Sequence, residues 1–181
     1  MVNKKILIGS VVAMMLLSGC ANKVHDYSVS TENMVVLKNI AKTTKGVKLG
    51  DFTDSNRNQS SVGCRLSTPI GVPEGETFVS YIKKAFEKEL VVTDMHNKSA
   101  KHTISANLDE LKGSTLPAYW EFKMTLSSTN GKSYQTHTKY SYQSSFSAMS
   151  ACSEMQRSFV IGVQKLIGDS IKNPQFKILI K

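Results

Sequence analysis

The sequence contains few of the residues from which a metal or catalytic centre is built. Its 181 residues include only four histidines and three cysteines. The histidines are scattered, and they form neither the i, i+4 helical pair nor the Cys/His cluster that a zinc site needs. They are His25, His96, His102 and His137. We therefore expect surface histidines and no metal site.

Other catalytic patterns are also missing. The sequence has no glycine-rich phosphate loop, and its Ser-Ser pairs at 127–128 and 144–145 lie outside any nucleophile-elbow pattern. Asp109 and Glu110 are adjacent on a predicted strand, so their side chains should point to opposite faces and not form a carboxylate pair. We predict a chain that is not an enzyme and has no catalytic residue or cofactor.

The N-terminus, by contrast, carries a specific signal. Lys4 and Lys5 precede an apolar run from Ile6 to Leu17, which is too short for a typical membrane-spanning helix and is typical of a secretory signal. The run ends in Leu17, Ser18, Gly19 and Cys20, a pattern that resembles the bacterial lipobox. The resemblance implies cleavage before Cys20, with diacylglycerol on its thiol and an N-acyl chain. An ordinary signal peptide with an accidental cysteine, or an uncleaved anchor, are the alternatives.

The residue after Cys20 indicates to which membrane the lipoprotein is sorted. It is Ala21 and not the Asp that retains enterobacterial lipoproteins in the inner membrane, so the resemblance implies the outer membrane, facing the periplasm. Loss of the signal lowers the formal charge from +9 to about +7. Partners would be the membrane, through the lipid, and an envelope protein. Nucleic acid is excluded by compartment, and a basic surface without a dedicated ligand remains an alternative.

The first half of the mature chain predicts two strands and one helix. A short strand is expected at Met34–Leu37, a second at Val47, Leu49 and Phe52, and an exposed loop at 54–61. Residues 76–90 place apolar side chains on one helical stripe, which predicts an amphipathic helix. The stripe consists of Phe78, Ile82, Ala85, Phe86 and Leu90.

From residue 101 onward, apolar residues recur at every second position. Alternation at 104–108, 120–126 and 134–142, with Asn130-Gly131 as a hairpin turn, predicts a three-stranded antiparallel meander. A long helix from Ser147 to Lys172 should follow and end at Asn173-Pro174. The apolar tail 176–180 is expected to pack back as a strand or a single turn.

These elements predict an α+β fold in a two-layer sandwich, with a mostly antiparallel sheet packed by two amphipathic helices. The expected organisation is a signal peptide at 1–19, the lipidated cysteine with a flexible tether at 20–33, and one periplasmic α+β domain at 34–181. With Cys20 consumed by lipid, Cys64 and Cys152 form an even pair in an oxidising compartment, which predicts a disulfide. Two buried free thiols are the alternative.

Two residue sets could form a binding surface. Lys83, Lys84 and Lys88 make a basic edge on the first helix, and Tyr134, Tyr140 and Tyr142 share one strand face. Anionic glycolipid or peptide are the ligands that such residues would suit. A solvated helix face and ordinary strand-forming tyrosines explain the same residues without a ligand.

Several segments together resemble a family of small uncharacterised proteobacterial lipoproteins. They are Cys64-Arg65, FVSYIKKAFEKEL at 78–90, SANLDELKGS at 105–114, WEFKMTLSSTNGKSY at 120–134, SAMSAC at 147–152 and IKNPQFKILIK at 171–181. The likeness covers nearly all of the mature chain and implies fold and location. The shared motifs are packing and turn motifs, so the resemblance implies no active-site residues. In size and topology the domain is also similar to auxiliary subunits of envelope machines.

Three functions therefore compete. The expected one is a membrane-anchored, non-catalytic lipoprotein that binds a partner or supports an envelope assembly. The second is a module that binds an anionic glycolipid or peptide through the lysines or tyrosines. The third is a hydrolase whose site forms only in three dimensions. A concave pocket with convergent polar groups favours the second or third, and an exposed apolar patch favours the first.

Overall fold

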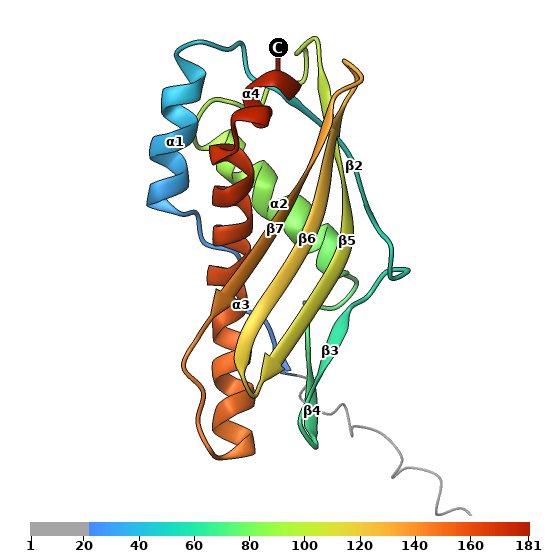
Figure 1. The fold of residues 1–181 in the computed structure, drawn as a ribbon, viewed down its shortest axis with the longest axis vertical. Helices are drawn as coiled ribbons and strands as arrows, with labels where there is room; N and C mark the ends of the chain where they lie inside the picture. Colours follow the sequence, from blue (N-terminus) through green and yellow to red (C-terminus); the bar gives the residue numbers. More distant parts are fainter. Residues whose placement is uncertain (1–21) are drawn as a thin grey trace, which may run out of the picture.

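The computed structural model describes residues 22–181, which form an α+β fold elongated along one axis (Figure 1). Its main sheet has the strand order β2-β5-β6-β7. The strands are β2 (Lys48–Asp54), β5 (Thr103–Thr115), β6 (Ala118–Ser128) and β7 (Ser133–Ser141). β5, β6 and β7 are antiparallel neighbours, which confirms the predicted meander, and β2 adds to β5 in parallel.

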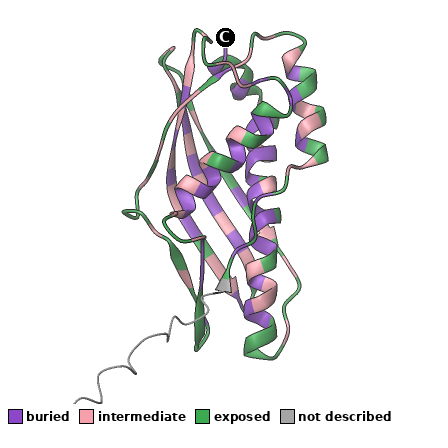
Figure 2. Ribbon diagram, turned by 180° about the vertical axis from the view of Figure 1, so that it is seen from behind, coloured by how far each residue is buried: buried purple, intermediate pink, exposed green. Residues whose placement is uncertain are grey.

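The helices lie on one face of this sheet (Figure 1). They are α1 (Thr31–Ala41), α2 (Phe78–Val91), α3 (Ala148–Lys172) and α4 (Pro174–Leu179). α2 and α3 are the two helices that the apolar stripes predict, and their buried sides face the sheet (Figure 2). The expected α+β fold is confirmed, although two helices were predicted and the described residues form four.

A second, small sheet lies at one end of the molecule, at the bottom of Figure 1. It has the order β1-β4-β3 and consists of β1 (Asn22–Lys23), β4 (Ser67–Gly71) and β3 (Ser61–Cys64). β1 runs parallel to β4, with Asn22 opposite Ile70. The predicted loop between β2 and β3 is present, but β1, β3 and β4 were not predicted.

The core between sheet and helices is aromatic. Trp120 and Phe159 have ring centroids 4.9 Å apart, and Phe78 lies 5.1 Å from Phe159. The Trp120 indole N–H donates to the carbonyl of Met155 at 3.0 Å, which ties β6 to α3. Phe86 and Phe159 are both fully buried, as their positions on the helical stripes predict.

The disulfide between Cys64 and Cys152 is confirmed. It joins the end of β3 to the first turns of α3, and the two Cα atoms are 5.8 Å apart, within the range that the bond requires. It therefore fastens the small sheet to the long helix. The signal and lipobox motif, including Cys20, lie outside the described residues.

The predicted strand at Met34–Leu37 is wrong, because these residues form part of α1. The Ser30 hydroxyl accepts a hydrogen bond from the backbone N–H of Asn33 and so begins a helix. Asn33, Leu37 and Ile40 are then buried at helical spacing. Burial against α2 and α3 outweighs the weak strand preference of two valines.

The prediction of a flexible tether is wrong for residues 22–33. Val24 and Tyr27 are buried, and the Val24 backbone N–H donates to the carbonyl of Gly71 at 2.7 Å. The Tyr27 hydroxyl donates to the buried carboxylate of Glu89. Polar composition suggested a loose segment, but the burial of Val24 and Tyr27 together with these hydrogen bonds docks it on the domain.

The prediction that Asp109 and Glu110 face opposite ways is also wrong. The pairing of β5 with β6 shifts between Leu108 and Glu110, so Asp109 is an extra residue in a β-bulge. Leu108 and Leu111 are both buried, and the two acids therefore face outward together. Each has separate partners: the Asp109 carboxylate accepts from the Thr125 hydroxyl at 2.7 Å, and that of Glu110 accepts from lysines.

Candidate binding groove

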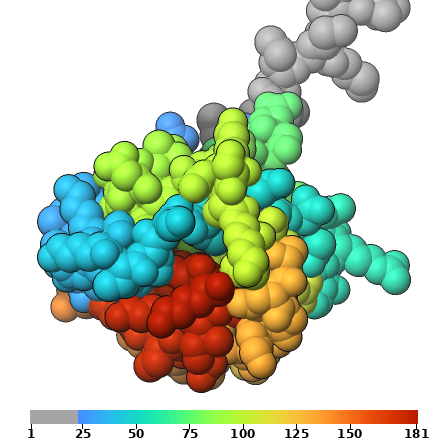
Figure 3. Space-filling model, turned by 90° about the horizontal axis from the view of Figure 1, so that it is seen from above, coloured from blue at the N-terminus to red at the C-terminus, as the bar shows by residue number. Residues whose placement is uncertain are grey.

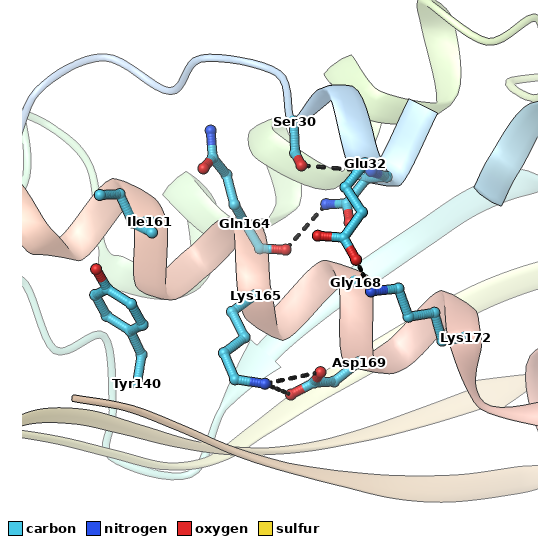
Figure 4. Close-up of a pocket in the computed structure, with 10 residues that line it drawn as sticks. Ser30, Glu32, Tyr140, Ile161, Gln164, Lys165, Gly168, Asp169 and Lys172 are labelled. Carbon is cyan, nitrogen blue, oxygen red and sulfur yellow. Dashed lines mark hydrogen bonds and ion pairs between the residues drawn. The ribbon is translucent and has the colours of Figure 1, made fainter. Parts of the chain in front are cut away.

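A hollow of about 300 Å³ lies between α1, α3 and β7, and we call it the groove (Figure 4). Its lining combines charged, amide and apolar side chains from three elements that are distant in sequence. The residues are Ser30, Glu32, Asn33, Tyr140, Ile161, Gln164, Lys165, Gly168, Asp169 and Lys172. Tyr140 is the only member of the predicted binding surface that lines it.

The charges in the groove compensate one another. Lys165 contacts both carboxylate oxygens of Asp169, at 3.0 and 2.9 Å, one helical turn away on α3. Lys172 of α3 pairs with Glu32 of α1. Such exposed pairs contribute little to stability. The lysines and acids can therefore exchange these partners for those of a bound molecule at small cost.

Close contact between α1 and α3 creates the floor of the groove. A Cβ at Gly168 would lie 2.7 Å from the side-chain oxygen of Asn33, so only glycine accommodates α1 at this distance. The Asn33 amide donates to the carbonyl of Gln164 at 2.9 Å and to Glu89 at 3.2 Å. Asn33 thus links α1, α2 and α3.

Beneath the groove lies the fully buried carboxylate of Glu89. Its Oε1 atom accepts hydrogen bonds from the Tyr27 hydroxyl, the Ser30 backbone N–H and the Asn33 amide. Its Oε2 atom has no hydrogen-bond partner among the described residues. Burial, followed by the hydrogen bond to Glu89, raises the pKa of Tyr27 well above its ordinary value. The tyrosine therefore stays a hydrogen-bond donor at any physiological pH.

The predicted tyrosine platform is not open to a ligand as a whole. The Tyr134 hydroxyl donates to the carbonyl of Ser170 at 2.7 Å, and that of Tyr142 donates to the carbonyl of Ser114 at 2.8 Å. Burial raises the pKa of both hydroxyls. These two tyrosines anchor β7 to its neighbours, and Tyr140 between them is half-buried beside the groove.

The predicted basic edge lies elsewhere. Lys84 pairs with Glu76 at 2.6 Å, and the Lys88 ammonium donates to the carbonyl of Tyr27 at 3.3 Å. Lys83 is half-buried on the same helix. The structure does not bring these α2 side chains together with the tyrosines of β7, so the two sets do not form one surface.

Sequence reasoning missed Asn33, Glu89 and Gly168. One signal for Glu89 was present, because it lies three residues after Phe86 and seven after Ile82 on the apolar stripe. Ser30 before Thr31-Glu32 was the corresponding N-cap signal for α1. Nothing local in the sequence indicates that α1 would lie against Gly168.

Chemically the groove is suited to binding. It offers two lysines, two carboxylates, a glutamine amide and a phenol around the exposed side chain of Ile161. No group of three or more potential metal ligands occurs in residues 22–181. Over the same range, no helix has the length and apolar character to cross a membrane.

Comparisons with known proteins give a match to a solved structure. No family model matches the chain, and no curated protein matches it. Its structure is similar to that of protein XCC0632 from Xanthomonas campestris, described under the family model DUF330, with a TM-score of 0.51 and 7% sequence identity. The match covers 74% of this chain and 87% of the other. At this identity the likeness shows the fold alone, shared with a protein from a proteobacterium.

Proposed function

We propose that the chain is a lipid-anchored protein of the bacterial envelope. In this proposal it is exported, cleaved before Cys20, acylated on that cysteine and held at the outer membrane, facing the periplasm. The observation that carries the proposal is the Cys64–Cys152 disulfide. It pairs two of the three cysteines and suits an oxidising compartment, which the N-terminal signal implies independently.

Within the envelope its role is that of a non-catalytic subunit that binds a partner protein. The groove supports this role, because its ion pairs are exposed and Ile161 offers an apolar contact beside Tyr140. A polar peptide segment of a partner fits such a lining better than an anionic glycolipid does. The lysines in the groove are already matched by carboxylates, which would repel phosphate groups.

The anchor is tested by metabolic labelling with an alkyne fatty acid. The full chain should take up label, Cys20→Ala should take up none, and the double variant Cys64→Ala/Cys152→Ala should keep it. Ala21→Asp should move the protein from the outer to the inner membrane fraction. Label on the Cys20→Ala variant would show that the lipid is elsewhere and the assignment wrong.

The role is tested by a photoreactive amino acid placed at Ile161 in living cells. Val91, which is exposed to a similar degree at the end of α2, is the matched control position. A discrete protein adduct at Ile161 and none at Val91 is expected. Adducts with the mass of a glycolipid at Ile161 would favour the ligand-binding alternative, and identical patterns at both positions would contradict a role for the groove.

A further inference from the structure

The most exposed large apolar side chains of the described residues gather at one end of the molecule. They are Leu66 (106%), Phe146 (103%), Leu116 (85%) and Met149 (82%). Leu66 lies in the β3–β4 turn, Leu116 in the β5–β6 turn, Phe146 in the connection from β7 to α3, and Met149 in the first turn of α3. We call these four residues the apolar tip; the β3–β4 turn, the β5–β6 turn and the start of α3 lie at the bottom of Figure 1. Other exposed large apolar residues reach at most 57% and lie on or next to the helices.

The apolar tip is held together by Arg65. Its guanidinium donates to the Thr115 hydroxyl at 3.0 Å and to the carbonyls of Ser145 and Phe146 at 3.1 and 2.7 Å. It thereby joins the three turns that carry the apolar side chains, and the disulfide at Cys64 adds a covalent link. These acceptors are neutral oxygens, and no carboxylate of residues 22–181 forms a salt bridge with Arg65; the nearby carboxylate of Glu154 accepts from Ser145.

The described chain begins at the same end. β1 runs parallel to β4, so the chain enters β1 from the side on which β4 begins, at Ser67 beside Leu66. From Ile70, the partner of Asn22, to Ser67 is about 10 Å along the strand. Cys20 is two residues before Asn22, a reach of at most about 7 Å. The described chain therefore enters the domain from the side of the apolar tip, and the proposed acylation site is two residues earlier in the sequence.

The opposite end of the molecule differs in character. There α4, the β6–β7 turn and the segments 42–47 and 92–102 meet (Figure 3). A hollow at this end is lined by exposed Lys45, Lys101 and Lys181 together with threonine, serine and asparagine. Exposed apolar residues at this end, Val92 (43%) and Ile178 (42%), are less exposed than any of the four at the apolar tip. A domain with its most exposed apolar side chains at the end where the described chain begins would have a preferred orientation on a bilayer.

We propose that the apolar tip inserts into the interfacial layer of the membrane that holds the Cys20 lipid. Leu66, Leu116, Phe146 and Met149 enter the boundary between headgroups and acyl chains, and Arg65 lies at the level of the lipid phosphates. This inference rests on the proposed lipid anchor and goes beyond it. The domain would stand upright on the bilayer at a fixed height, and not swing on its anchor.

The test uses the lipidated protein reconstituted in vesicles of phosphatidylethanolamine and phosphatidylglycerol, with or without bromine on the upper acyl carbons. Phe146→Trp and Leu66→Trp report on the tip, and Ile178→Trp on α4 is the control at the other end. The buried Trp120, the single natural tryptophan, contributes a constant background. The added tryptophan at 146 or 66 should lose roughly half its emission to brominated lipid, and that at 178 almost none.

Flotation of the same vesicles separates the two proposals. Protein that floats with acyl mass on Cys20, yet shows no quenching at 146 and 66, overturns membrane insertion of the tip and leaves the anchor standing. The tip would then be free to bind a protein. Equal quenching at positions 146 and 178 would also overturn membrane insertion of the apolar tip. Protein without acyl mass that does not float overturns both proposals.

Discussion

Replacing Glu89 by alanine should release the N-terminal segment from the domain. The carboxylate is the common acceptor for Tyr27, Ser30 and Asn33, which lie on the segment between β1 and α1 or within α1 itself. Without it, the tyrosine hydroxyl and the asparagine amide lose a buried partner. In the proposed anchored protein, Cys20 precedes this segment in the sequence, so the same change would loosen the link between anchor and domain.

The magnitude follows from the number of donors left without an acceptor. Hydrogen bonds to a charged group contribute about 1.5–3 kcal/mol each. Removing the buried carboxylate also removes the unfavourable desolvation of its charge, which offsets part of that sum. We expect Glu89→Ala to lower the free energy of unfolding by about 3–5 kcal/mol.

Glu89→Gln is the matched control. Its amide oxygen can accept the same three hydrogen bonds, while its amide nitrogen replaces Oε2, which has no partner in the described residues. The amide brings two N–H groups without an acceptor, while one unpaired oxygen and one buried charge are removed. Glu89→Gln should therefore lower the unfolding free energy by clearly less than Glu89→Ala does.

Urea unfolding followed through the buried Trp120 measures both variants, and limited proteolysis reports whether residues 22–30 become accessible. Greater cleavage in Glu89→Ala than in Glu89→Gln is expected. If the glutamine variant is destabilised as strongly as the alanine variant, the charge itself is required and the hydrogen-bond argument fails. If neither variant is destabilised, the segment is not held by this carboxylate.

Three other perturbations give further tests. Replacing both cysteines of the disulfide by alanine should cost up to roughly 4–5 kcal/mol of unfolding free energy, since the bridge spans 88 residues; a loss below about 1 kcal/mol would contradict the chain-entropy argument. Phe159→Ala should cost about 3–5 kcal/mol in the same urea assay, because the ring is fully buried among aromatic side chains; a near-neutral result would place it outside the core. Hydrogen bonds from Lys112 and Lys123 lower the pKa of Glu110 to about 2, so the stability from these contacts is present above pH 4.5 and is lost as the pH falls towards 2. An NMR titration of Lys123→Met should show this pKa moving up towards 4.5, and an unchanged value would refute the assignment.

The helices and strands that could be predicted from sequence are those whose apolar periodicity extends over many consecutive residues. The meander has period-two alternation over three segments and an Asn-Gly turn, and α2 and α3 each carry an apolar stripe over three or more turns. Their burial patterns follow because one face of each must leave water. The disulfide was predictable because an even pair of cysteines remained after Cys20 was assigned to lipid.

The wrong predictions concern residues whose conformation depends on contacts with segments that are distant in the sequence. The bulge at Asp109 inserts one residue into β5, and every side chain beyond it is inverted relative to a regular strand. The mark of the shift is the spacing of three between Leu108 and Leu111, where regular alternation would place apolar residues two apart. A period-two argument applied across it predicted opposite faces for two acids that face the same way.

The groove was least predictable, because its geometry depends on α1 lying against α3. That contact requires Gly168 on one helix and Asn33 on the other, 135 positions apart in the chain, and a buried acid on a third helix to satisfy the asparagine. Each of the three residues looks ordinary alone: a glycine in a helix, an asparagine near an N-cap and a glutamate between lysine and leucine. Only their joint burial makes the N-terminal segment part of the domain, and this packing fixes the end of the domain at which the described chain begins.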